Sequence, residues 1–311
     1  MRIAVYIPLL LSLLAPHGAR PLAERCEPRL ATWLLTASAL VLGTATTISL
    51  GLLTITGLIR FPQLADLGHW SAHTAQRSDP AELSVALIAG LLLGAAVLMA
   101  ARMLWRRART LATAALEAAC MPAEDGLVVI EDEAPNAFAI PGLPGRVVVS
   151  TGMLHTLDET ERHILLAHER AHLAAHHYAF VALAQLGAAA NPLLRPLATA
   201  VTYTIERWAD EMAATATGDR ERVARTVGKA ALAAHHTPAR TPGAALAILG
   251  RRTPLTAAGP VPRRVAALLA PPFGRRPLLA ATTATLLAAA VVSTAEAAHD
   301  LHLLLETVGA R

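Results

Sequence analysis

Three long runs of uncharged, apolar residues limit what this 311-residue chain can fold into. The runs lie at 31–59, 83–105 and 278–298, and at most one charged residue interrupts each of them. About 20 predominantly apolar residues are enough for a helix to cross the hydrocarbon core of a bilayer. Since 54% of all residues are hydrophobic and only 16% are charged, the composition agrees with a multi-pass α-helical membrane protein.

A shorter apolar run, residues 3–16, stands at the N-terminus. Its length is marginal for a membrane span and suits the apolar part of a signal peptide. The residues that follow it, His17-Gly-Ala19, form a poor cleavage site for signal peptidase. We therefore expect a retained first span, with removal as a signal peptide as the alternative.

The arginines indicate which side of the membrane each segment occupies. They cluster after the third span and before the fourth, at Arg102, Arg106, Arg107, Arg109, Arg275 and Arg276. Cytoplasmic loops carry an excess of Lys and Arg, so the segment between these clusters is expected in the cytoplasm if residues 3–16 are retained. The expected organisation is a membrane region at 1–109 with three spans (about 3–16, 31–59 and 83–105), a cytosolic domain at 110–276, and a fourth span with a short external tail at 277–311.

The overall charge does not indicate a nucleic-acid-binding protein. The net charge is +4 and the pI is near 9.7, but aromatic residues make up only 4% of the chain and the arginines flank apolar runs. The two cysteines, Cys26 and Cys120, lack the spacing of a metal site and are too few for a disulfide framework. Unpaired cysteines agree with reducing cytosol.

The segment 110–276 is long enough for one compact domain of mixed helices and strands. Short β-prone runs bounded by Pro or Gly predict three strands, at 126–130, 136–140 and 146–150. Helices are expected at 110–119, 204–217, 220–236 and 261–269, and the rest of 237–276 is expected to be a loosely structured link to the membrane. The apolar stretch 179–203, which Asn191-Pro192 and Pro196 interrupt, predicts a helical hairpin on the domain or at the bilayer surface, with a true membrane excursion as the alternative.

Residues 161–178 contain no Gly or Pro and predict one continuous helix. A capping box is expected just before it, with Thr156 as the N-cap and Glu159 at the third helical position. His168 and His172 lie four residues apart on this helix, so both imidazoles face the same side and can bind one metal ion. Glu169 follows the first histidine and can take a proton from a metal-bound water. This His-Glu-x-x-His pattern is typical of zinc hydrolases, and we expect one Zn²⁺ per chain.

A catalytic zinc site needs a third protein ligand and an open position for water. Glu206 and Asp210 lie four residues apart on a second predicted helix. We assign metal ligation to Glu206 and, to Asp210, a hydrogen bond to the outer N–H of a ligand imidazole, which fixes the tautomer of the ring. The alternative is that these acids form a solvated helix face.

The paired motifs His168-Glu-Arg-Ala-His172 and Glu206-Arg-Trp-Ala-Asp210 resemble the HExxH…ExxAD pairing of gluzincin membrane proteases. These include the CAAX prenyl proteases, the heat-shock membrane proteases and the BlaR/MecR-type β-lactam sensor peptidases. Residues 135–139 and 149–154 also resemble the strands that these families place before the zinc motif. The order of three spans, a cytoplasmic protease and one more span is most similar to the BlaR/MecR-type layout. Their extracellular penicillin-binding sensor domain has no counterpart here, which puts β-lactam sensing in doubt.

The resemblance implies a multi-pass membrane protein with a cytosolic, mainly helical α+β domain of the zincin type. It implies zinc-dependent hydrolysis of peptide bonds at the cytoplasmic membrane face, with Glu169 as general base. The partners would be the lipid bilayer and a protein or peptide substrate, with a cytoplasmic transcriptional repressor as the family-like guess for a regulatory role. Four side chains are open as donors to the oxyanion: His176, His177, Tyr203 and Arg207. The predicted strand 136–140 is either an edge that pairs with an extended substrate or an ordinary structural strand.

Two other functions are consistent with parts of the sequence. An intramembrane site-2-type protease would also use a His-Glu-x-x-His motif, but charged Glu161, Arg162 and Arg170 argue against a lipid-buried motif helix. A membrane signalling protein with a structural zinc site would not need Glu169, which is present.

Overall fold

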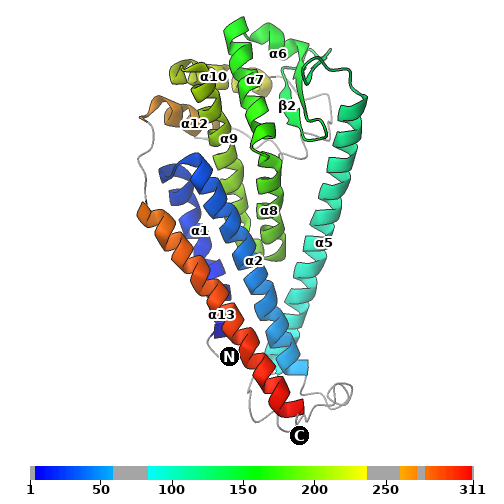
Figure 1. The fold of residues 1–311 in the computed structure, drawn as a ribbon, viewed down its shortest axis with the longest axis vertical. Coiled ribbons are helices and arrows are strands. Elements are labelled where there is room, and N and C mark those ends of the chain that lie inside the picture. The colour runs from blue at the N-terminus through cyan, green and yellow to red at the C-terminus, as the bar shows by residue number, and fades with distance from the viewer. Residues whose placement is uncertain (1–3, 59–82, 237–259, 272–276, 310–311) are drawn as a thin grey trace.

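The structure, a computed structural model, describes residues 4–58, 83–236, 260–271 and 277–309. Figure 1 shows two regions along the long axis. Long helices, α1 (Ile7–Arg25), α2 (Pro28–Leu58), α5 (Leu83–Cys120) and α13 (Pro277–Gly309), extend through the lower part of the view, where both termini lie. The small sheet and the helices α6, α7, α10 and α12 gather at the opposite, upper end.

Within the described ranges, three helices are long and apolar enough to cross a membrane: Pro28–Gly57, Ser84–Glu117 and Pro277–Leu303. They coincide with the expected second, third and fourth spans. The expected first span, 3–16, falls largely within α1, which is not among the three. Arg20, Glu24 and Arg25 occupy the last turns of α1, so its uncharged part, from Ile7 to Ala19, is about 20 Å long, against about 30 Å of hydrocarbon. A first span therefore stays a prediction.

The helix α5 corrects the expected boundary between the third span and the following domain. We predicted a span at 83–105 and a separate helix at 110–119, but α5 is continuous from Leu83 to Cys120. The physical reason is that the arginine-rich stretch between them contains only residues with good helix propensity and no Gly or Pro. The helix therefore runs directly from the apolar region to the sheet (Figure 1).

The three predicted strands form one small sheet, with β1 at Leu127–Ile130, β2 at Ala137–Ile140 and β3 at Arg146–Ser150. The strand order is β1-β3-β2, with β1 parallel and β2 antiparallel to β3. The central strand β3 is the most buried, and Val147 and Val149 pack on Leu165 of the motif helix. The strand β2 is therefore an edge of the sheet as the described residues form it.

The helix that carries the histidine motif begins earlier and ends earlier than predicted. It is α7, Glu159–Ala174, and a short helix α6, Thr151–Thr156, precedes it. The capping box is formed by Asp158 and Glu161, not by Thr156 and Glu159: the Asp158 carboxylate accepts from the Glu161 N–H (2.8 Å) and the Glu161 carboxylate accepts from the Asp158 N–H (2.9 Å). Thr156 cannot cap α7, because it ends α6 and its hydroxyl donates to the carbonyl of Gly152.

A break at Ala175–His176 separates α7 from α8 (His177–Ala190), so the predicted single helix 161–178 is wrong. His176 adopts a left-handed conformation, with φ at 51°, which histidine visits more readily than most residues. The change of direction after Ala174 places His177 beside the motif histidines.

The predicted hairpin is formed by α8, the short turn Pro192–Leu194 and α9 (Arg195–Thr217). The helix α9 begins nine residues before the expected start at Thr204 and ends where Gly218 adopts a left-handed φ of 70°. The hairpin packs against α2: Gly187 lies against the backbone of Ala39 and Gly43, and the Asn191 amide donates to the Thr46 hydroxyl. Small residues let two helix backbones approach closely, and α8, at 14 residues, is too short to cross a bilayer.

The remaining helices close the upper region. The helix α10, Arg220–His236, agrees with its prediction, and α12, Pro260–Leu269, agrees within one residue. Ile164 of α7 packs with Ala213 of α9, Val223 of α10 and Leu268 of α12. This core fixes α7 and α9 side by side, which is what positions the candidate site.

Candidate metal centre

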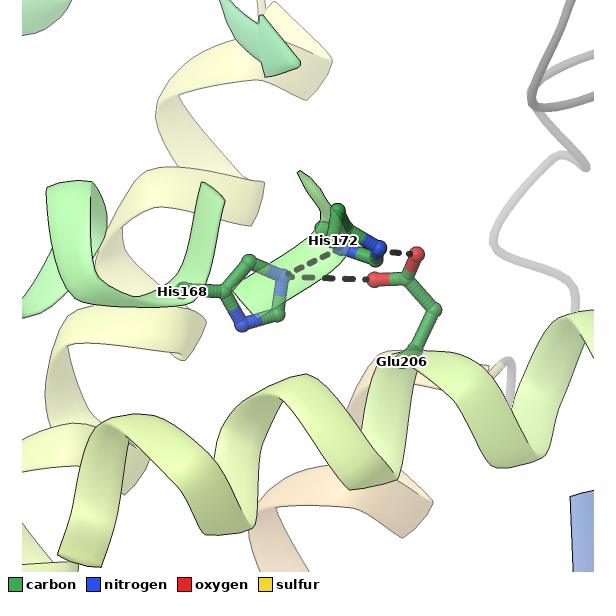
Figure 2. A group of neighbouring side chains, drawn as sticks. All are labelled: His168, His172 and Glu206. Carbon is green, nitrogen blue, oxygen red and sulfur yellow. Dashed lines mark hydrogen bonds and ion pairs between the residues drawn. The ribbon is translucent and has the colours of Figure 1, made fainter. Parts of the chain in front are cut away.

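Three predicted metal ligands meet between α7 and α9. His168 and His172 are buried on α7, and Glu206 faces them from α9 (Figure 2). The Nε2 atoms of the two histidines lie 3.1 Å apart. The Glu206 carboxylate lies 3.6 Å from each, through Oε2 to His168 and through Oε1 to His172. Among the residues that the structure describes, these three side chains form the one group close enough together to hold a metal ion.

The donor set fits a zinc ion. Zinc binds histidine nitrogen and carboxylate oxygen at about 2.0–2.2 Å in tetrahedral geometry, which separates neighbouring donors by about 3.3–3.6 Å. The separations of 3.1 and 3.6 Å are close to this value. Three protein donors also leave one tetrahedral position for water, as in catalytic zinc sites.

Both histidines have a buried partner on the ring nitrogen that faces away from the group. His168 Nδ1 lies 3.0 Å from the carboxylate of Asp210, one turn after Glu206 on α9. His172 Nδ1 shares a hydrogen bond of 2.9 Å with Nδ1 of His177, the first residue of α8. Such partners fix the ring orientation and leave Nε2 free for a metal. We predicted the place of Asp210 but gave His177 no such role, because the break that brings it back to His172 was not predicted.

Arg264 of α12 joins the two acidic residues of α9. Its Nε and NH2 donate to both oxygens of Asp210, at 2.8 and 2.7 Å, and its NH1 lies 2.8 Å from Oε2 of Glu206. A planar guanidinium suits this two-pronged contact better than a lysine would. We predicted a helix at 261–269 but no role for Arg264 in it, because Arg264 lies 54 residues after Asp210 and no local pattern connects the two.

The electrostatics of the group favour a bound cation. Burial lowers the pKa of His172 to about 4 and that of His177 to about 3, so both rings are neutral at pH 7. Burial also opposes protonation of His168, but Asp210 and Glu206 outweigh it and raise the pKa of His168 to about 10 in the absence of a cation. Despite its burial, Glu206 has a pKa well below the usual range, because Arg264 and the two histidines stabilise its charge. The pocket thus contains two carboxylates, and a cation bound at Nε2 of His168 can replace the proton of that ring and balance their charge.

One comparison with known proteins bears on this chemistry. Residues 100–191 match Peptidase family M48. The matched segment includes α7 with both histidines and Glu169, and it ends before Glu206, so the third ligand rests on the geometry of the structure. No curated protein and no solved structure matches the chain. The match supports a metallopeptidase, and peptidases of family M48 are zinc-dependent.

In a peptidase, Glu169 is the residue placed to handle protons. It is buried, and burial, opposed by the charge of His168, raises its pKa to about 7. The backbone of Ala139 on β2 hydrogen-bonds to it. Among the described residues, no other strand pairs with this edge of β2: the Ser150 N–H donates to the carbonyl of Asn136, and since antiparallel partners alternate, Ala137 and Ala139 direct their backbone groups away from β3. The open edge of β2 therefore lies beside Glu169.

The four residues considered as oxyanion donors differ in their contacts. The Arg207 guanidinium donates to the carbonyl of Ala23 in α1, at 2.6 Å, and His177 is bonded to His172. Tyr203 lies under the guanidinium of Arg263, 4.6 Å from the ring centre. His176 occupies the break between α7 and α8. Arg207 and His177 thus have structural partners, and the oxyanion donor stays a prediction for all four residues.

Proposed function

We propose that this chain is an integral membrane, zinc-dependent endopeptidase that cleaves a protein substrate at the cytoplasmic membrane face. The observation that carries the proposal is the convergence of His168, His172 and Glu206 (Figure 2), with the buried carboxylate of Glu169 interacting with His168 and Glu206. The match to family M48 supports the reaction class independently of this geometry. The three long apolar helices support the membrane location.

The residues divide the work of peptide hydrolysis. When bound by His168, His172 and Glu206, zinc supplies a Lewis acid that polarises the scissile carbonyl and acidifies water. Glu169 takes the proton of the attacking water and passes it to the leaving amine. Asp210 and His177 hold the two imidazoles in the tautomer that presents Nε2, and Arg264 holds Glu206 and Asp210 in place.

The open edge of β2 is the place where we propose that substrate binds. A peptide in extended conformation can add to an unpaired strand edge by main-chain hydrogen bonds. The outward backbone groups of Ala137 and Ala139 lie next to Glu169, so a peptide paired there would pass the proton-handling carboxylate. Main-chain recognition suits a regulatory protein with an extended segment, such as the repressor that the family resemblance implies.

The proposed function predicts zinc-dependent proteolysis by the purified full-length protein. We expect about one zinc per chain and cleavage of an unfolded protein such as casein. Dialysis against a chelator should abolish cleavage, because the buried donor set then lacks its cation, and one equivalent of zinc should restore it. Mass spectrometry of the products measures the cleavage. The proposal would be contradicted if the wild-type protein contained no zinc and added zinc did not stimulate cleavage.

The proposed orientation can be tested with a native cysteine. Cys120 is exposed at the end of α5, next to the sheet, whereas Cys26 is buried. If the upper region lies in the cytoplasm, a membrane-impermeant maleimide should label Cys120 only after the cells are permeabilised. A Cys120→Ser variant identifies any labelling elsewhere. Labelling of intact cells would reverse the topology and leave the peptidase chemistry untouched.

A further inference from the structure

A cavity lined by arginines lies apart from the metal centre, between α5 on one side and the α8–α9 hairpin on the other. Its volume is about 1090 Å³. Arg102, Arg106, Arg107 and Arg109 line it from α5, and Arg195 lines it from the start of α9. The described residues that line it include no Asp or Glu. Five cations thus surround one cavity without an acidic side chain in its wall.

The spacing of these arginines costs helix stability unless an anion is present. Arg102, Arg106 and Arg109 are four and three residues apart, so they project from the same side of α5. Like charges at this spacing destabilise a helix. Arg107 is held across the cavity by Gln185 of α8, through bonds from its Nε (3.1 Å) and NH2. The amide of Gln185 orients that guanidinium across the cavity and carries no charge of its own.

The position of the cavity along α5, relative to the thickness of a membrane, indicates which anion would reach it. Nineteen residues of α5 separate Leu83 from Arg102, which is about 28 Å along a helix, close to the thickness of the hydrocarbon core. If α5 spans the membrane, the arginines lie at the membrane surface, on the side of the metal centre. Met99, Met103 and Trp105 also line the cavity, and tryptophan favours the boundary between headgroups and acyl chains.

We propose that this cavity binds the phosphate headgroup of an anionic membrane phospholipid. Basic pockets between transmembrane helices at the cytoplasmic side are suited to such headgroups. The arginines supply two-pronged contacts to phosphate oxygens, and Met99 and Met103 provide an apolar surface for the upper part of an acyl chain. A bound headgroup would link α5 to the hairpin whose second helix carries Glu206.

The test measures lipid retained by the full-length protein in mixed micelles of phosphatidylglycerol and phosphatidylcholine at equal concentration. Native mass spectrometry should find phosphatidylglycerol retained in preference to phosphatidylcholine. The double variant Arg106→Gln/Arg195→Gln removes one charge from each wall, and we expect retention to fall about fivefold for each arginine, or roughly 25-fold together. The matched control, Arg222→Gln/Arg225→Gln, removes two charges from α10, outside the cavity, and should retain the lipid as the wild type does.

Three results would overturn the proposal: equal retention of both lipids by the wild type, an equal loss in the control variant, or displacement of the lipid by inorganic phosphate at the same concentration. A second measurement keeps all five arginines, so it does not depend on the folding of the charge-removing double variant. Brominated phosphatidylglycerol should quench the fluorescence of Trp105, which is assigned as the part of the signal that the Trp105→Phe variant lacks. Brominated phosphatidylcholine should quench this fluorescence much less. Equal quenching by the two lipids would also count against the site. Since neither measurement needs zinc or substrate, a failed protease assay would not affect them.

Discussion

Replacement of Glu169 by Gln is expected to lower kcat about 10²–10⁴-fold, the usual contribution of a positioned general base. Glutamine keeps the size of the side chain and can still hydrogen-bond to the backbone of Ala139, but it cannot accept the proton of the attacking water. Because Glu169 is not one of the three grouped ligands, zinc content should stay at about one per chain. Casein cleavage and metal analysis on the same preparation measure both quantities.

The matched control for this variant is Glu159→Gln. Glu159 begins the same helix, is exposed and lies outside the metal group. It should leave both kcat and zinc content unchanged. If Glu169→Gln cleaves as fast as this control, Glu169 is not the base. If it instead loses zinc, the buried carboxylate supports the fold of the site more than the chemistry.

The sequence was sufficient for the central part of the site because helix periodicity constrains it. A spacing of four residues places His168 and His172 on one face of any helix, and the same spacing relates Glu206 to Asp210. The three strands were also recognisable, since Pro and Gly bound each of them. What remained open was whether the two helices meet, and that depends on the packing of Ile164 against Ala213 and its neighbours.

The parts that sequence did not predict depend on backbone conformation and on long-range contacts. His177 reaches His172 only because His176 turns the chain with a positive φ, and no Gly or Asn announces that turn. Arg264 reaches Asp210 from α12, and the sequence on both sides of this helix is rich in Pro and Gly. The capping box shifted by two residues because Thr156 already belonged to α6. Local patterns predict the candidate ligands, whereas tertiary contacts determine which residues hold them in place.

The second large expected effect is on zinc affinity, and it distinguishes the carboxylate that binds zinc from the one that supports a ligand. Glu206→Ala is expected to weaken zinc binding by roughly a thousandfold, because protein zinc sites with four ligands hold about 10–16 kcal/mol and each ligand supplies a share of this. The loss is enlarged by Arg264, whose NH1 now contacts Glu206 and would face the zinc position without that negative charge. Asp210→Asn should weaken zinc binding only about 10–100-fold, as is usual for residues that orient a ligand. Competition with a chromophoric chelator measures both affinities.

The order of these two effects decides the assignment of roles. Glu211→Ala is the matched control, since Glu211 directly follows Asp210 in the sequence but pairs with Arg220 away from the metal group. It should bind zinc as tightly as the wild type. A larger loss in Asp210→Asn than in Glu206→Ala would exchange the two roles and make Asp210 the ligand. That exchange would require the carboxylate now 3.0 Å from the outer nitrogen of His168 to turn towards Nε2, and breaking its two bonds to Arg264 opposes that movement.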